Sequence, residues 1–121
     1  MPDKHILLVE DEVTTREILT DVLRGEGYDV DSVATAGAAT TCLESIFYSL
    51  VIADWVLPDA DGTDIADAAA QLGSKTLIVT GYLSDLPAGV AERHALMSKR
   101  LGYPEIVAAV RRAIGSPDAI P

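Results

Sequence analysis

The chain has 121 residues and a mass of 12.8 kDa, the size of about one domain with a single hydrophobic core. Its 19 acidic residues against nine basic ones give a net charge of −10, which disfavours direct binding to nucleic acid or to an anionic membrane face. The single cysteine, Cys42, excludes an internal disulfide and a cysteine-based zinc cluster, and the N-terminus resembles neither a signal peptide nor a membrane span. We expect an acidic, cytoplasmic single domain over residues 1–121, with its core at 4–115 and a frayed tail at 116–121.

Five short apolar runs typical of β-strands recur along the chain, at residues 5–9, 28–33, 50–53, 76–79 and 96–98. The first, third and fourth are continuous, whereas the second alternates between apolar and polar residues. Continuous runs of this length favour strands that are buried on both faces of a parallel sheet.

Amphipathic patterns typical of helices separate these runs, at residues 14–24, 36–46, 63–72, 87–93 and 103–114. We expect Ile18, Ile46 and Leu72 to face the core, and Pro87 to lie in the first turn of the fourth helix. Five alternating strand and helix units predict an α/β fold with helices on both faces of a parallel sheet.

Polar side chains follow four of the expected strands. Glu10, Asp11 and Glu12 follow the first strand, Asp54 follows the third, Thr80 follows the fourth and Lys99 follows the fifth. Ligands of open parallel α/β sheets bind beyond the carboxyl ends of the strands, so these groups are expected at one edge. Carboxylates that converge there repel one another, and a hard divalent cation such as Mg²⁺ relieves the repulsion.

This set of groups suits phosphoryl transfer. A carboxylate beside Mg²⁺ can act as a nucleophile toward phosphorus, and Asp54 is the candidate. The reaction needs positive charge and hydrogen-bond donors around the phosphoryl oxygens, which Lys99 and Thr80 would supply. Each residue alone is unremarkable, because acidic runs in loops are usually only solvated; the prediction rests on all of them occurring in these positions.

In this order the motifs resemble the receiver domain of bacterial two-component response regulators, over residues 4–115. The resemblance rests on residues 6–12, 54–58, Gly62, 77–81 and Lys99. It implies a flavodoxin-like (βα)5 three-layer sandwich with strand order 2-1-3-4-5. It also implies that Asp54 accepts a phosphoryl group from a histidine kinase or a phosphotransfer protein.

The resemblance assigns further roles to the residues at the strand ends. Mg²⁺, or Mn²⁺ in its place, would be held by Glu10, Asp11, Asp54 and the main-chain carbonyl of Val56. Thr80 and Lys99 would bind the phosphoryl oxygens.

Several positions depart from the family pattern, and two of them bear directly on the site and its switch. Arg100 stands where a proline usually follows the lysine, so we expect a trans peptide bond there. Leu96 stands where many receivers carry an aromatic residue that swings inward, so that switch cannot operate at this position. We therefore expect an unusual face around the fourth helix and fifth strand, and an unusual, still unidentified, downstream protein partner.

Two further side chains are expected to tune the site, and three others are expected to have no part in its chemistry. Val56 and Tyr82, each two residues beyond a site residue, should exclude attacking water and slow autodephosphorylation. His5 is expected to be structural, His94 to lie at the surface and Cys42 to pack on the second helix.

The leading hypothesis is an interaction module that is switched by phosphorylation and catalyses only its own phosphoryl acceptance and hydrolysis. One alternative is a degenerate receiver that acts as a scaffold without phosphorylation, as Leu96 and Arg100 suggest. The other is a small Mg²⁺-dependent aspartyl-phosphate phosphatase of the haloacid dehalogenase type. Against this stands Val56, where those enzymes carry a second aspartate.

Overall fold

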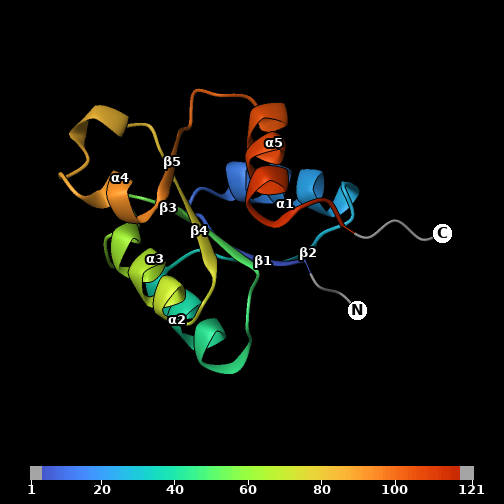
Figure 1. The fold of residues 1–121 in the computed structure, drawn as a ribbon, viewed down its shortest axis with the longest axis horizontal. Coiled ribbons are helices and arrows are strands. Elements are labelled where there is room, and N and C mark those ends of the chain that lie inside the picture. The colour runs from blue at the N-terminus through green and yellow to red at the C-terminus, as the bar shows by residue number, and fades with distance from the viewer. Residues whose placement is uncertain (1–3, 118–121) are drawn as a thin grey trace.

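The computed structural model describes residues 4–117, which form a five-stranded parallel sheet with helices on both faces (Figure 1). The strands are β1 (His5–Val9), β2 (Asp29–Val33), β3 (Leu50–Asp54), β4 (Lys75–Thr80) and β5 (Ala95–Ser98). The helices are α1 (Val13–Gly25), α2 (Ala36–Ser45), α3 (Gly62–Gln71), α4 (Val90–Arg93) and α5 (Tyr103–Ile114), with a 3₁₀ turn, η1 (Leu83–Asp85), before α4. The strand order is β2-β1-β3-β4-β5, which confirms the predicted flavodoxin-like topology.

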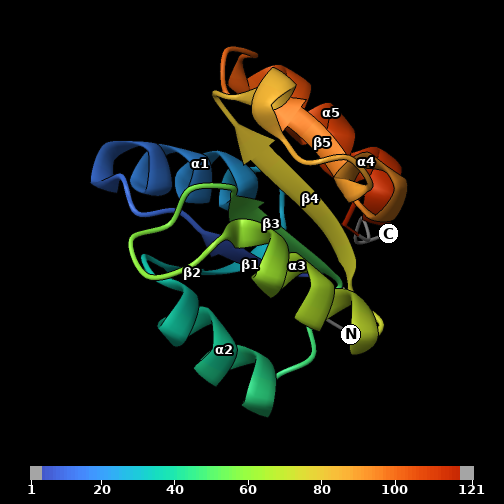
Figure 2. The same cartoon turned by 90° about the vertical axis from the view of Figure 1, so that its left-hand side faces the viewer.

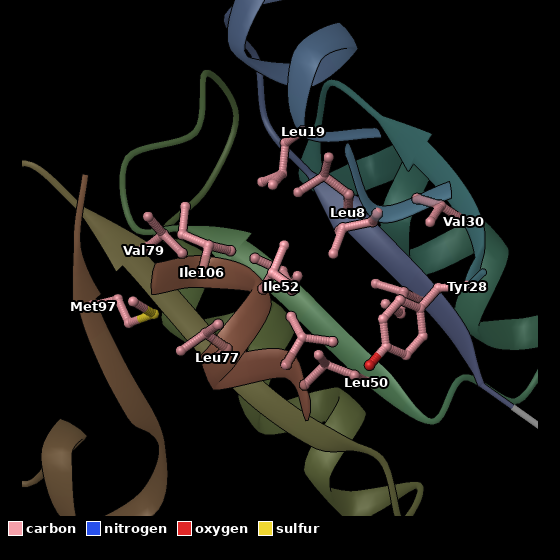
Figure 3. Packing of buried hydrophobic residues seen from close by; sticks show 14 residues of the cluster. Leu8, Leu19, Tyr28, Val30, Leu50, Ile52, Leu77, Val79, Met97 and Ile106 are labelled. Carbon is pink, nitrogen blue, oxygen red and sulfur yellow. The ribbon is translucent and has the colours of Figure 1, made fainter. Parts of the chain in front are cut away.

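Helices α1 and α5 cover one face of the sheet, and α2 and α3 cover the other (Figures 1 and 2). Successive side chains of a strand point to opposite faces, so the continuous apolar runs supply both layers. In β1, for example, Ile6 and Leu8 enter the core beneath α1 and α5, while Leu7 and Val9 enter the core beneath α2 and α3. Figure 3 shows the first of these cores, where Leu8 and Ile52 from adjacent strands lie among side chains of both helices.

Three helices begin directly at the edge of the sheet where the site was predicted, and each is capped by a side chain of the preceding loop. The carboxylate of Glu12 accepts the Thr15 amide of α1 at 2.7 Å, and that of Asp61 accepts the Thr63 amide of α3 at 3.1 Å. The Thr35 hydroxyl caps α2 in the same way. These bonds satisfy amides that the first helical turn leaves unpaired, and they fix the loops that carry the site.

The connection from β3 to α3 requires glycine at position 62. A β-carbon there would lie 1.9 Å from the Asp54 carbonyl oxygen, so any side chain would displace the backbone of the strand end. The Gly62 amide also donates to the Trp55 carbonyl at 2.7 Å, which closes the loop. The requirement for glycine therefore comes from close backbone approach.

The prediction for the fourth helix was wrong in its extent. Pro87 lies outside the helix, which begins only at Val90 and is four residues long. Gly89 precedes it with a φ of +94°, a left-handed conformation that cannot continue a right-handed helix back toward Pro87.

Three apolar residues expected to face the core are exposed instead: Ile18, Ile46 and Leu72. Ile46 and Leu72 follow the last residues of α2 and α3, where the helical periodicity no longer sets their direction. Ile18 lies one residue before the buried Leu19, about 100° around the helix, and so falls outside the buried stripe.

His94 was predicted at the surface, and this was wrong: its side chain is 1% exposed. The imidazole Nε2 lies 2.6 Å from Asp67 Oδ1 on α3, and Nδ1 lies 2.6 Å from the Thr76 hydroxyl on β4. Asp67 also accepts a hydrogen bond from the Arg93 guanidinium at 3.1 Å. The histidine just before β5 thus joins α3, β4 and α4, a role that depends on partners from distant parts of the chain.

The structure agrees with the predictions for His5, for Cys42 and for the peptide bond before Arg100. His5 lies 3.0 Å from the Asp31 carboxylate and packs on the Tyr48 ring, which agrees with a structural role. Cys42 packs against the core beneath α2 and α3, as predicted. No peptide bond among residues 4–117 is cis, which confirms the trans bond before Arg100. Residues 118–121, most of the tail expected to fray, lie outside the described residues.

No helix among residues 4–117 combines the length and the apolar character needed to cross a membrane.

The Asp67 carboxylate should make the stability of the fold depend on pH. Hydrogen bonds from His94 and then Arg93 hold the pKa of Asp67 below its ordinary value. A depressed carboxyl pKa stabilises the folded state above the unfolded pKa, and this contribution is lost as pH falls through the folded pKa. We expect Asp67→Asn to cost about 1 kcal/mol at pH 7, a modest figure because the carboxylate is 39% exposed.

Urea unfolding at pH 7 and at pH 3 measures this effect. The penalty of Asp67→Asn should shrink at pH 3, while the control Asp21→Asn, an exposed carboxylate in the middle of α1, should cost little at either pH. An Asp67→Asn penalty that is the same at both pH values would contradict the assignment.

Candidate functional site

Three carboxylates converge at the carboxyl ends of the two central strands. Val9 pairs with Ala53 in the parallel register of β1 and β3, so the residues that follow, Glu10 and Asp54, reach the sheet edge together. Glu10, Asp11 and Asp54 each offer an oxygen, and these oxygens all lie within 4.8 Å of one another. Glu10 and Asp54 are buried, whereas Asp11 is exposed. The structure thus brings together the acidic residues that the sequence predicted.

Lys99 lies against this acidic group. Its Nζ is 2.8 Å from Asp54 Oδ2 and 3.0 Å from Glu10 Oε1. Lys99 directly follows β5, and its main-chain amide donates a hydrogen bond to the Thr80 carbonyl at 2.9 Å. One ammonium therefore contacts two buried carboxylates, and negative charge remains in excess at the site.

The pKa shifts follow from this arrangement. Burial raises the pKa of Glu10 above its ordinary value, and hydrogen bonds from the Glu12 amide and from Lys99 only partly oppose this. Burial lowers the pKa of Lys99, but its hydrogen bonds to Asp54 and Glu10 outweigh burial and raise that pKa overall. Lys99 is thus firmly protonated at neutral pH, and the carboxylates stabilise its positive charge.

Thr80 ends β4, one residue beyond Val79, which pairs with Asp54 in the adjacent strand. Its side chain is fully buried, and its hydroxyl oxygen accepts the Tyr82 amide at 2.9 Å. Because that bond uses an oxygen lone pair, the hydroxyl proton remains available for donation to another group. Thr80 thus lies on the strand next to Asp54, without a direct hydrogen bond to it.

Val56, Tyr82 and Leu96 differ in their exposure. Val56 and Tyr82 are 52% and 58% exposed, so both present apolar surface to solvent beside the site. Leu96 is half-buried and packs with Trp55 against a small cluster that includes Val90 of α4. A leucine at this position lies within the packing between α4 and the sheet.

A cavity of about 200 Å³ adjoins these groups on the face of the sheet covered by α1 and α5. Glu10, Asp54 and Lys99 line it, together with apolar side chains such as Leu19 and Leu101. Beside the charged groups there is thus room for a small ligand or for waters.

Two supporting residues were not foreseen. The Arg16 guanidinium donates to the carbonyl of Glu10 at 2.9 Å and so braces the loop after β1. The Asp59 carboxylate accepts the amides of Ala36 and Gly37 at 2.8 and 2.9 Å. The position of Arg16, about one helical turn beyond the acidic run, could have suggested the first contact. No local signal marks the second, which joins residues more than 20 positions apart.

Comparisons with known proteins agree with this geometry. The family model for the response regulator receiver domain matches residues 6–111. The response regulator receiver protein CpdR of Brucella abortus is 32% identical over 81 residues, which cover 65% of this chain and 68% of that protein. The DNA-binding response regulator MtrA of Mycobacterium tuberculosis is 37% identical over 62 residues, which are 51% of this chain and only 27% of that protein.

Solved structures give the same result. A CheY-like receiver domain from Methanospirillum hungatei is 28% identical with a TM-score of 0.82, covering 92% of this chain and 93% of that one. The response regulator TrrA of Thermotoga maritima, solved in complex with Mg²⁺-BeF, is 26% identical with a TM-score of 0.81, covering 91% of this chain and 98% of that one. With the family model matching most of its length, the chain belongs to the response regulator receiver domains, the signalling modules of two-component systems.

Proposed function

We propose that Asp54 is the phosphoacceptor of this receiver domain and that its phosphorylation shifts the domain toward a state that binds a partner. The observation that carries the proposal is the contact of one ammonium, that of Lys99, with Asp54 at 2.8 Å and with Glu10 at 3.0 Å. This places a candidate nucleophile beside a fixed positive charge in a buried site, the arrangement that phosphoryl transfer requires.

The donor set fits a hard divalent cation. Glu10, Asp11 and Asp54 offer carboxylate oxygens within 4.8 Å of one another, and Mg²⁺ binds one or two carboxylates while keeping several waters. The main-chain carbonyl of Val56 would be a further ligand, and the same oxygen ligands suit Mn²⁺. When bound, the cation would supply positive charge to the carboxylates and to the phosphoryl oxygens. The Mg²⁺-BeF complex of TrrA supports this proposal by similarity.

The chain's own residues would act as follows. An Asp54 carboxylate oxygen forms a bond to phosphorus while the bond to the leaving group breaks, and the electron pair departs with that group. The Lys99 ammonium would leave the Asp54 carboxylate and bind a phosphoryl oxygen, where the negative charge then lies. Thr80 would donate its free hydroxyl proton in a hydrogen bond to another oxygen.

The Thr80 hydroxyl suggests how the signal would leave the site. It holds the Tyr82 amide at the start of η1, so a shift of Thr80 toward the phosphoryl group would pull on that bond. Leu96 cannot supply an aromatic swing, and we infer that the segment from Tyr82 through η1 carries the change. Phosphorylation would thereby shift the population of conformations on this face.

The partners follow from the family and from the charge. The phosphoryl donor would be a histidine kinase or a phosphotransfer protein in the cytoplasm, and residues 1–121 would act as a single receiver domain. The net charge of −10 favours a protein as the downstream partner over nucleic acid. DNA binding by MtrA does not transfer to this chain, because the matched residues are a minor part of that protein.

Incubation with acetyl phosphate and MgCl₂, followed by mass spectrometry of the intact protein, tests the phosphoacceptor. We expect one added phosphoryl group on the wild type and on the control Asp64→Asn, and none on Asp54→Ala. An adduct that persists in Asp54→Ala would contradict the assignment. A folded wild type without an adduct would support the degenerate scaffold, and sustained turnover of p-nitrophenyl phosphate would support the phosphatase.

A second prediction concerns the lifetime of the aspartyl-phosphate. Val56 and Tyr82 present apolar surface where a polar side chain would orient attacking water, so autodephosphorylation should be slow. Tyr82→Glu should shorten the lifetime several-fold, because a carboxylate can position that water, whereas Tyr82→Phe should leave it nearly unchanged. The decay of the phosphorylated mass after removal of acetyl phosphate measures this. Rapid decay of the wild type, with no acceleration in Tyr82→Glu, would refute the prediction.

A further inference from the structure

The loop between β3 and α3, residues 55–61, is attached to its own surroundings and also to a distant helix. Within its surroundings, Leu57 is buried in the core beneath α2 and α3, and Asp61 caps α3. Its distant attachment is Asp59, whose Oδ1 accepts the Ala36 amide at 2.8 Å and whose Oδ2 accepts the Gly37 amide at 2.9 Å. These are the first two residues of α2.

The contact between Asp59 and α2 is a charged one. Both carboxylate oxygens of Asp59 are used, and the positive end of the helix dipole lies beside them. The two amide hydrogen bonds, that of Ala36 first, hold the pKa of Asp59 below its ordinary value, so the side chain is ionised at neutral pH. Helix α2 already has its own cap in Thr35, whose hydroxyl accepts the Ala38 amide at 3.1 Å. Asp59 is thus a second hydrogen-bond acceptor at the start of α2, and it comes from the loop between β3 and α3.

Asp59 is close in the chain to the peptide group assigned to the cation. Val56 forms an isolated antiparallel bridge with Asp61, and the Leu57 amide donates to the Ala60 carbonyl at 3.3 Å. These contacts close a tight turn with Asp59 at its tip. A displacement of Asp59 from α2 would therefore move the turn as a unit and shift the Val56 carbonyl.

We propose that Asp59 is a positioning residue for the cation site, which ties the loop carrying the Val56 carbonyl to the N-terminus of α2. The inference rests on the proposed function, because it concerns the same cation. Binding linkage is reciprocal, so a cation held by this loop must also tighten the contact between Asp59 and α2. The N-terminus of α2 thereby becomes sensitive to occupancy of the site.

Calorimetric titration of the full chain with MgCl₂ tests the positioning role. Asp59→Ala should weaken Mg²⁺ binding about tenfold, the lower end of the loss seen when outer partners of metal ligands are removed. The Mg²⁺ affinity of Asp59→Asn should fall between those of the wild type and Asp59→Ala, because the asparagine amide oxygen can still accept one of the two hydrogen bonds. The matched control is Thr35→Ala, which removes a cap of α2 without touching the loop and should leave the affinity unchanged.

Amide hydrogen exchange supplies a second readout, which reports on the N-terminus of α2 directly. In the wild type, MgCl₂ should slow exchange at Ala36 and Gly37, and this slowing should be absent in Asp59→Ala, which lacks both hydrogen bonds. Unchanged exchange at these amides on Mg²⁺ binding, or equal affinities of wild type and Asp59→Asn, would overturn the inference and leave the phosphorylation of Asp54 standing. Failure of the wild type to bind Mg²⁺ at all would overturn the proposed function and this inference with it.

Discussion

Two carboxylates buried side by side, with one ammonium between them, are the constraint on which this structure depends. Glu10 and Asp54 are each less than a tenth exposed, and like charges with little access to water repel each other strongly. Lys99 contacts both and compensates one of the two charges. The exposed Asp11 adds a third negative charge nearby. This edge of the sheet is therefore suited to bind a cation. It can accommodate a phosphoryl group only when further positive charge is present.

The fold keeps these groups together by ordinary packing. The central strands β1 and β3 are neighbours in the sheet, and their apolar side chains are buried on both faces, so their ends cannot separate without opening two cores. The loops after them are braced in turn, one by Arg16 and the other by Gly62 and Asp59. The repulsion at the site is thus opposed by the whole sheet rather than by any single contact.

Sequence reasoning located the features that depend on local pattern and a simple topological rule. Continuous apolar runs identified the central strands to within one residue at either end, and the rule for parallel sheets then placed Asp54 and Lys99 at one edge. The sequence did not predict features that depend on partners from elsewhere in the chain. His94 is buried because α3 and β4 supply its hydrogen bonds, and Asp59 contacts a helix more than 20 positions away. Leu72 shows a third limit, since helical periodicity does not extend past the last turn.

Urea unfolding of the full chain at pH 7, in EDTA and in MgCl₂, tests most directly whether the site holds uncompensated negative charge that a cation relieves. A ligand that binds only the folded state raises stability by mass action, so Mg²⁺ should raise the unfolding midpoint of the wild type. The increase should be largely lost in Asp54→Asn, which removes one carboxylate while keeping its shape. A wild-type midpoint that does not respond to Mg²⁺, or an equal increase in Asp54→Asn, would contradict the account.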